Sequence, residues 1–221
     1  MGREVHFRTN RSMSIIYMGY FITLSGLDGS GKTTQCLKLK KKMINTGITV
    51  NVIHFKKVDS FPYLFIAKKK AQQFIVSKNI KDIVKQRSIL SAYIFCEKAN
   101  DLISWSQKSF DLTIIDRYYE SALCYHYLRG ELSKELCEIY SQLIKTDLSV
   151  FLDISPDKCI ERLARRSTLS PYETKEYLEQ AHYFYHTKFK SFWKIDASLS
   201  PDEISHQIYS KIIKAYFKGH L

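Results

Sequence analysis

The chain has 221 residues, a length that suits one α/β domain with a substantial hydrophobic core. Hydrophobic residues make up 45% of the chain, which excludes an intrinsically disordered protein. The formal net charge of +12 favours polyanionic ligands, and nucleotides, nucleic acid and membrane surfaces all meet that criterion. Charge alone therefore does not choose among these ligands.

Cysteine usage and hydropathy indicate a cytoplasmic protein. No apolar run approaches the roughly 18 residues that are needed to span a bilayer, so we expect no membrane partner. The cysteines have no C-x-x-C spacing, and their pattern indicates neither a zinc site nor a disulfide framework. They are Cys36, Cys96, Cys124, Cys137 and Cys159. This scatter is typical of a reducing, cytoplasmic compartment.

The first residues are expected to lie outside the folded domain. Residues 1–17 lack the apolar segment of a signal peptide, and we interpret them as a disordered or non-native N-terminal extension. Met18 directly precedes the first predicted strand and is a candidate for the biological start. A short organelle-targeting leader is the alternative interpretation. Residues 18–221 are then expected to form a single domain.

The main motif is a glycine-rich loop between a predicted strand and a predicted helix. Residues 20–24 are apolar, and residues 26–34 follow the pattern G-x-x-x-x-G-K-[ST], whose backbone N–H groups surround nucleotide phosphates. We expect Lys32 to lie on a solvent-open loop and reach the β- and γ-phosphate oxygens, and Thr33 to hold Mg²⁺. An ordinary glycine-rich turn is the alternative. The predicted phosphate-binding residues are Gly26, Asp28, Gly29, Ser30, Gly31, Lys32, Thr33 and Thr34.

The chain after this loop alternates helices and strands. A helix is expected to begin at Lys32 and end before Gly47, and residues 48–53 predict the next strand. Residues 54–62 show no regular period and predict an irregular loop. Apolar residues recur at helical spacing over residues 81–106, which predicts one long helix.

A second functional position lies at the end of the apolar strand that residues 110–116 predict. Asp116 ends this strand at the carboxyl edge of the sheet, where nucleotide-binding folds hold Mg²⁺. A solvent-facing aspartate is the alternative. Arg117 follows at once and can face the gap between donor and acceptor phosphates. A surface ion pair with Asp111 or Glu120 is the alternative for Arg117.

The second half of the chain completes the predicted fold. Two further strands are expected at residues 149–153 and 192–196, each followed by a helix. Ser-Pro pairs at Ser155, Ser170 and Ser200 have the form of an N-cap followed by proline at the first helical position. The alternation predicts an α/β, P-loop kinase fold with a parallel sheet of about five strands, helices on both faces and a small basic lid.

The lid is expected at the end of the helix that starts after Ser155. Arg162, Arg165 and Arg166 lie there, before a break at residues 167–170. Arginines in this position could close over the phosphates of ATP, stabilise developing charge and exclude water. A basic last turn that complements the helix dipole is the alternative interpretation.

These motifs resemble those of the thymidylate kinase family. The resemblance extends over residues 20–217. It is most specific at residues 21–35 and 116–126, with support from residues 151–153 and 195–198. The resemblance implies that the chain uses ATP and Mg²⁺ and forms a homodimer.

The resemblance also implies roles for individual residues. Asp28 would lie near the 3′-hydroxyl and phosphate of the acceptor, and Arg117 would bind that phosphate. Tyr125 would occupy the space of a ribose 2′-hydroxyl, while Ser121 and the neighbouring backbone would face the base. Together with Lys32 and the lid arginines, Asp28 and Arg117 form the expected catalytic set.

Three features depart from the family pattern. Ser25 stands where many members have glutamate, and residues 54–62 lack the usual arginine and glycine-rich acceptor segment. The family's base-stacking phenylalanine and the arginine four residues later correspond best to Ile94 and Lys98, on one face of the long helix. We therefore expect Ile94 and Lys98 to bind the acceptor, with a neighbouring aromatic residue as the alternative for stacking.

The sequence thus predicts a nucleoside monophosphate kinase that transfers the γ-phosphate of ATP to dTMP and gives dTDP. One alternative is a related P-loop kinase for another nucleotide or small phosphorylated acceptor. A second alternative is a basic P-loop nucleotide switch or nucleic-acid-binding protein. No Asn-Lys-x-Asp motif is present, which disfavours a GTPase. We expect small nucleotide substrates and no nucleic acid partner.

Overall fold

The fold is that of a computed structural model, which describes residues 19–55, 58–165 and 170–218 and the side chains of these residues as far as residue 215. The extension predicted at residues 1–17 and the candidate start Met18 lie outside the described residues.

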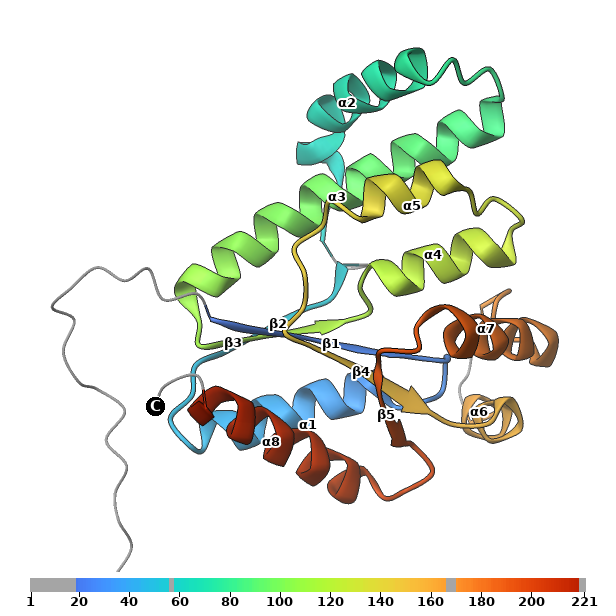
Figure 1. The fold of residues 1–221 in the computed structure, drawn as a ribbon. Coiled ribbons are helices and arrows are strands. Elements are labelled where there is room, and N and C mark those ends of the chain that lie inside the picture. Colours follow the sequence, from blue (N-terminus) through green and yellow to red (C-terminus); the bar gives the residue numbers. More distant parts are fainter. Residues whose placement is uncertain (1–18, 56–57, 166–169, 219–221) are drawn as a thin grey trace, which may run out of the picture.

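A five-stranded parallel sheet forms the centre of the structure (Figure 1). The order across the sheet is β2-β3-β1-β4-β5, and every neighbouring pair is parallel. All five strands therefore end at the same edge. This confirms the predicted fold class and all five predicted strands. The strands are β1 (Tyr20–Gly26), β2 (Val50–Ile53), β3 (Leu112–Asp116), β4 (Leu148–Asp153) and β5 (Trp193–Asp196).

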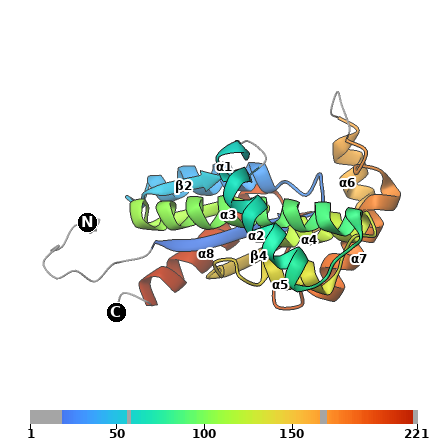
Figure 2. The same ribbon diagram turned by 90° about the horizontal axis from the view of Figure 1, so that it is seen from above.

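Helices cover both faces of this sheet. Helices α1 and α8 lie on one face, and α3, α4 and α5 lie on the other, with α2 outside α3 (Figures 1 and 2). None of the described helices is long and apolar enough to cross a membrane. The helices are α1 (Lys32–Ile44), η2 (Phe61–Tyr63, a 3₁₀ turn), α2 (Leu64–Ser77), α3 (Ile83–Ser109), α4 (Tyr119–Leu128), α5 (Lys134–Tyr140), α6 (Pro156–Leu163), α7 (Lys175–Lys188) and α8 (Pro201–Lys218).

Strand β1 lies at the centre of the sheet and is buried on both faces. Phe21, Ile22 and Leu24 have no exposed surface, which explains the continuous apolar run in the sequence. Leu24 pairs with Asp116 of β3, and Gly26 at the end of β1 pairs with Leu152 of β4. The glycine loop therefore leaves the sheet between the ends of two neighbouring strands. This is the crevice where open parallel sheets bind ligands.

Two of the three predicted Ser-Pro helix starts are confirmed. The hydroxyl of Ser155 accepts a hydrogen bond from the N–H of Lys158 and caps α6. At the start of α8, Ser200 and Glu203 exchange both hydrogen bonds of a capping box, at 3.0 and 3.3 Å. Local sequence therefore determined where both helices begin.

The predicted helix start at Ser170 is wrong. The backbone N–H of Ser170 does donate to the Glu173 carboxylate, which is half of a capping box. However, residues 171 and 172 form a turn, and α7 begins only after Thr174, whose hydroxyl accepts from the N–H of Tyr177. Thr174 has the extended backbone that an N-cap needs and is the cap of α7.

The segment between β2 and α3 differs in part from the prediction. The long helix expected at residues 81–106 is confirmed as α3. The irregular loop predicted at residues 54–62 ends in the 3₁₀ turn η2, and α2 then follows without having been predicted. Within α2 only Ala67 and Ala71 are buried, while large apolar side chains such as Phe65 are exposed. The face of α2 toward the core therefore consists of these two alanines and the partly buried Phe74 and Ile75, and the exposed apolar residues elsewhere on the helix obscure this pattern in the sequence.

One buried acid carries an energetic cost in this fold. Glu120 lies in the first turn of α4 with no exposed surface, and no other described residue donates a hydrogen bond to its carboxylate oxygens. Burial raises the pKa of Glu120 from 4.5 to about 8. The charged form is therefore disfavoured, although a helix N-terminus attracts negative charge.

We expect Glu120→Gln to stabilise the protein at alkaline pH. Because the folded state keeps a proton that the unfolded chain releases above pH 4.5, wild-type stability should fall as the pH rises from there to about 8. The expected slope for this one group is at most about 1.4 kcal/mol per pH unit. Urea unfolding at several pH values measures it. Glu138→Gln, which changes an exposed acid, should leave the slope unchanged. Equal slopes for wild type and Glu120→Gln would contradict the prediction.

Candidate active site

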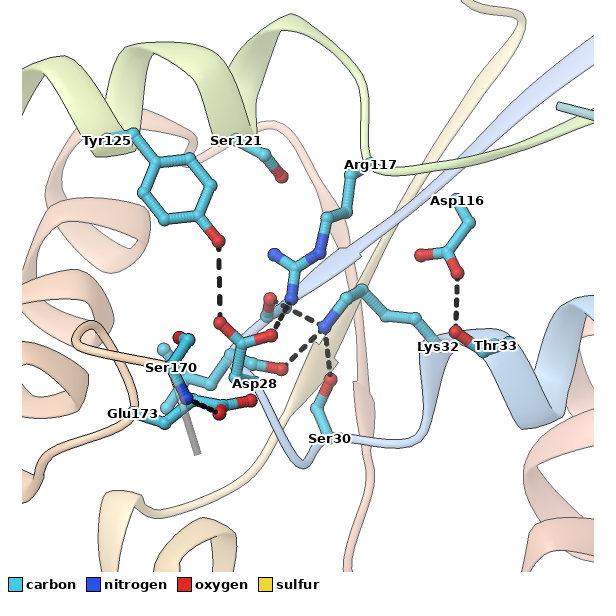
Figure 3. A network of polar contacts seen from close by, with 12 residues as sticks. Asp28, Ser30, Lys32, Thr33, Asp116, Arg117, Ser121, Tyr125, Ser170 and Glu173 are labelled. Atoms are coloured by element: carbon cyan, nitrogen blue, oxygen red, sulfur yellow. Dashed lines mark hydrogen bonds and ion pairs between the residues drawn. The ribbon is translucent and has the colours of Figure 1, made fainter. Parts of the chain in front are cut away.

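The glycine loop connects β1 to α1 at the carboxyl edge of the sheet (Figure 3). Gly29 and Gly31 have φ angles of +86° and +95°, which side chains rarely adopt. A Cβ atom on Gly29 would also lie 2.9 Å from the carbonyl oxygen of Cys159 on α6. Gly29 is therefore required by backbone conformation and by the close approach of α6.

Lys32 is the first residue of α1, and its side chain turns back into the loop. Only 5% of Lys32 is exposed, so the expectation of a solvent-open lysine is wrong. Burial, followed by repulsion from Arg117, lowers the pKa of Lys32 to about 7. An anionic phosphate beside the ammonium would raise this pKa. The Lys32 Nζ donates hydrogen bonds to the carbonyl oxygens of Gly26 (3.0 Å) and Leu27 (2.5 Å) and to the hydroxyl of Ser30 (3.3 Å).

Thr33 and Asp116 lie together, as predicted from the motif. The Thr33 hydroxyl donates to Asp116 Oδ2 at 2.6 Å (Figure 3). The other carboxylate oxygen of Asp116 is buried and has no hydrogen-bond partner among the described residues. A hydroxyl beside an unpaired carboxylate oxygen offers the hard oxygen ligands that Mg²⁺ prefers. These two residues therefore fit a magnesium ion.

His54 belongs to the same group of residues and was missed in the sequence. Its Nδ1 lies 3.2 Å from Asp116 Oδ2. His54 directly follows β2, which is the neighbour of β3 in the sheet. The position of His54 just after a strand was the available signal, because strand ends in a parallel sheet meet at one edge.

Arg117 joins the end of β3 to α4 with an unusual backbone. Its φ angle is +71°, and its N–H donates to the carbonyl oxygen of Leu24 at 3.2 Å. A non-glycine residue in this region usually marks a functional constraint. The guanidinium forms an ion pair with Asp28 of the glycine loop, not with Asp111 or Glu120, the partners that the alternative interpretation proposed.

A pocket opens beside this ion pair, between the glycine loop, α4 and α7. Four of the predicted acceptor residues, Asp28, Arg117, Ser121 and Tyr125, line it. The Tyr125 hydroxyl donates to Asp28 Oδ2 at 3.4 Å (Figure 3). The Ser121 hydroxyl hydrogen-bonds to the hydroxyl of Tyr185 at 2.9 Å. The structure therefore brings these four side chains to one cavity next to the phosphate loop.

Tyrosines that were not predicted from the sequence form much of the remaining wall of the pocket. Tyr177 and Tyr185 come from α7, and Tyr172 precedes that helix. The rings of Tyr125 and Tyr172 meet edge to face at a centroid distance of 5.3 Å. The recurrence of Tyr177, Ala181 and Tyr185 at helical spacing was the signal that could have identified this face of α7.

Ile94 and Lys98, the other predicted acceptor residues, are not among the residues that line the pocket. Lys98 is buried, and its Nζ donates to the carbonyl oxygens of Phe55 at 3.1 Å and Val58 at 3.3 Å and to the Ser60 hydroxyl at 3.1 Å. Lys98 therefore holds the loop after β2 against α3. Ile94 is half-buried and packs against the core. Their binding of the acceptor remains a prediction.

The aromatic neighbours of Ile94 are also engaged in packing. Phe95 lies 5.1 Å from the ring of Phe55 and 5.8 Å from that of Tyr140. Tyr93 is 7% exposed and contacts the ring of Phe74. Neither ring is a free stacking surface in this arrangement.

The structure describes two of the three predicted lid arginines, Arg162 and Arg165. Arg162, in the last turn of α6, donates to the carbonyl oxygen of Ala197 at 2.9 Å and to that of Gly29 at 3.4 Å. Arg162 therefore contacts the glycine loop directly. Arg165 follows the helix end and is exposed, and Arg166 lies outside the described residues.

A phosphate in the glycine loop would meet Lys32 on one side, and a second phosphate in the pocket would meet Arg117. Two cationic groups, both near Asp28, suit the transfer of a phosphoryl group between two phosphorylated molecules. This arrangement defines the class of P-loop nucleotide kinases.

Comparison with known proteins specifies the family. The sequence model of the thymidylate kinase family matches residues 24–208, which is most of the chain. The chain therefore belongs to the thymidylate kinase family, as its motifs suggested.

Curated relatives of this chain have thymidylate kinase names and share modest sequence identity with it. A probable thymidylate kinase of Archaeoglobus fulgidus is 25% identical over 197 residues, which cover 88% of this chain and 95% of the relative. The thymidylate kinase of Prosthecochloris aestuarii is 25% identical, with 87% and 92% covered. A probable thymidylate kinase of Pyrococcus horikoshii is 28% identical, with 70% and 75% covered. The similarity thus extends over nearly the whole length of the first two relatives and over three quarters of the third.

We expect Lys32→Ala and Lys32→Met to lose phosphotransfer activity. Removal of the ammonium should lower kcat on the order of 10²-fold or more, equivalent to about 3 kcal/mol. Because Lys32 is buried among loop carbonyls, Lys32→Met separates the charge from the packing of the side chain. Steady-state kinetics and thermal unfolding measure the two effects. Lys38→Ala, on the exposed face of α1, is the matched control and should remain active. A near-normal kcat for Lys32→Met would contradict the assignment of the donor site.

Proposed function

We propose that this chain transfers the γ-phosphoryl group of ATP to dTMP and produces dTDP. The observation that supports this function best is the pocket in which Asp28, Arg117, Ser121 and Tyr125 lie beside the phosphate loop. Membership of the thymidylate kinase family supports the same acceptor. A nucleotide switch would need no second anion-binding pocket next to its loop.

On the donor side, the loop N–H groups and Lys32 bind the phosphates of ATP. Lys32 exchanges its hydrogen bonds to the Gly26 and Leu27 carbonyls for hydrogen bonds to phosphate oxygens. The new bonds compensate for the loss of the bonds to the carbonyls. Thr33 and Asp116 would hold Mg²⁺, which would supply additional neutralisation of phosphate charge. His54 keeps the Asp116 carboxylate oriented toward this ion.

On the acceptor side, Arg117 binds the phosphate of dTMP. Arg117 is paired with Asp28 when no phosphate is bound, so an acceptor phosphate competes with a carboxylate for the same guanidinium. Phosphate binds a guanidinium strongly through paired hydrogen bonds. Asp28 is then released toward the 3′-hydroxyl of the acceptor, in agreement with the position that the resemblance implies.

Tyr125 limits the sugar that the pocket accepts. Its ring lies between Asp28 and Tyr172, where a 2′-hydroxyl would need space. A steric clash of this kind rejects a substrate by a few kcal/mol, whereas the methyl group of thymine adds only about 1 kcal/mol. The sugar should therefore be selected more strictly than the base.

We expect dTMP to be the best acceptor in a panel of monophosphates, dUMP to be tolerated and UMP to be at least about tenfold poorer than dUMP in kcat/KM. Tyr125→Ala should narrow the gap between dUMP and UMP. Tyr125→Phe, which keeps the ring and removes only the hydroxyl, should preserve it. ATP consumption with each acceptor measures these ratios.

The same panel distinguishes the alternative functions. A nucleotide switch or nucleic-acid-binding protein would consume no ATP in response to any acceptor. Faster turnover of a purine monophosphate or UMP than of dTMP would indicate a related kinase with another acceptor. Either outcome would contradict the proposed substrate.

Arg162, Arg165 and Arg166 are proposed to act as a basic lid over ATP. The hydrogen bond of Arg162 to the Gly29 carbonyl already places it at the phosphate loop. Replacing Arg162 by alanine should lower kcat and leave the KM of the acceptor unchanged. The reason is that, of the two nucleotides, the arginine would contact only the donor. A normal kcat in Arg162→Ala and Arg165→Ala together would show that the segment is only a charged helix end.

We also propose that residues 18–221 form one cytoplasmic kinase domain that assembles as a homodimer. Support for the dimer comes from the large apolar side chains that are exposed on η2, α2 and the first turn of α3, because exposed apolar side chains are common at protein–protein interfaces. Light scattering on the full chain measures the assembly, and a monomeric mass would contradict it. The exposed side chains are Phe61, Phe65, Ile66, Val76, Ile83 and Val84, with exposures from 49% to 80%.

A further inference from the structure

A second cluster of ligand-type side chains lies away from the catalytic residues, where β4 ends against α7. Asp153 is the last residue of β4, and His182 and His186 are one turn apart on α7. Asp153 Oδ1 lies 3.3 Å from His182 Nε2 and 3.0 Å from His186 Nε2. One carboxylate oxygen therefore faces two imidazole nitrogens from another element.

These separations are close to those of a metal site. With bonds of about 2.0–2.2 Å to nitrogen and oxygen, neighbouring ligands of a tetrahedral ion lie about 3.3 Å apart. One separation in the cluster has this length (3.3 Å), a second is 0.3 Å shorter (3.0 Å), and all three ligand atoms lie within 4.8 Å of one another. A small rotation of the His182 ring would complete the third edge.

The ligand types select the class of ion. Two histidines at positions i and i+4 on one helix face form a chelating pair, and Asp153 adds the negative charge that attracts a cation. Imidazole nitrogens favour zinc, cobalt, nickel and copper, whereas Mg²⁺ prefers oxygen ligands. We propose that Asp153, His182 and His186 form a binding site for a divalent transition metal ion of the zinc class, separate from the Mg²⁺ position at Thr33 and Asp116.

The surroundings support three protein ligands with an open fourth position. The side chains of the three residues are 29–32% exposed, and Asp153 borders a hollow at the ends of β4 and β5. An ion and a water ligand therefore have access. The ring of His186 is also held in place, because it packs edge to face on the buried Phe151 at 5.6 Å.

One neighbouring residue, Lys194, opposes metal binding, and its replacement tests the proposed site. Lys194 Nζ lies 3.0 Å from His186 Nδ1, to which it donates a hydrogen bond. This bond keeps the proton of a neutral His186 on Nε2, the nitrogen that must lose it to bind a metal. Lys194 is exposed on β5, so it can move away or be replaced without loss of core packing.

The ion would connect two regions of the enzyme. Helix α7 also lines the acceptor pocket, through Tyr177, Ala181 and Tyr185 on an adjacent face. An ion between Asp153 and the two histidines would fix this helix to the end of β4. Metal binding should therefore raise the melting temperature of the full chain.

The test uses the untagged full chain without nucleotide, titrated with Zn²⁺ by calorimetry and with Co²⁺ by visible absorption. Wild type should bind one ion with the absorption bands of tetrahedral cobalt. His182→Ala, His186→Ala and Asp153→Asn should each weaken binding by at least about tenfold. Lys194→Met should instead strengthen it, because the opposing ammonium is removed.

The control is His206→Ala, which removes an exposed histidine on α8 and should leave binding unchanged. Unfolding curves without metal verify that each variant is folded. Lys194→Met leaves the three ligands intact, so it tests the site even if a ligand variant is unstable. The proposal is overturned if the ligand variants bind Zn²⁺ as wild type does, or if Lys194→Met has the affinity of wild type.

Discussion

The parallel pairing of β1 with β3 and β4 is the constraint on which the active site depends. Because Leu24 lies opposite Asp116 and Gly26 opposite Leu152, the strand ends bring the glycine loop next to Asp116 and Arg117. The residues come from parts of the chain that are about 90 positions apart, as the 89-residue separation of Asp28 and Arg117 shows. No local sequence feature holds them together, and the sheet register does so.

Both buried cations of the site have hydrogen-bonding or ionic partners within the protein. Lys32 is satisfied by loop carbonyls, and Arg117 by Asp28. These internal partners keep the buried cations solvated by protein dipoles and prevent an uncompensated charge in the core. In the proposed function a phosphorylated ligand would replace these partners, and selectivity for phosphate would follow from its stronger pairing with both cations.

The sequence was sufficient for the order of the strands along the chain and for the loop motif, because both depend on local patterns of apolar residues and glycines. It was also sufficient for Thr33 and Asp116, since a P-loop motif and an acid at a strand end are expected to meet. The sequence was insufficient where tertiary packing determines which residues are in contact. Lys98 could not be seen to bind the loop after β2, and the tyrosines of α7 could not be assigned to the pocket, because those contacts join elements that are distant in sequence.

The backbone of Arg117 has a consequence for the evolution of this fold. Its φ of +71° is a conformation that glycine adopts freely and that costs other residues roughly 1–2 kcal/mol. Drift toward higher stability would therefore favour glycine at position 117, whereas the proposed binding of the acceptor phosphate needs the guanidinium. Selection for thermal robustness and selection for turnover oppose each other at this residue, and additional stability in this enzyme must come from other positions.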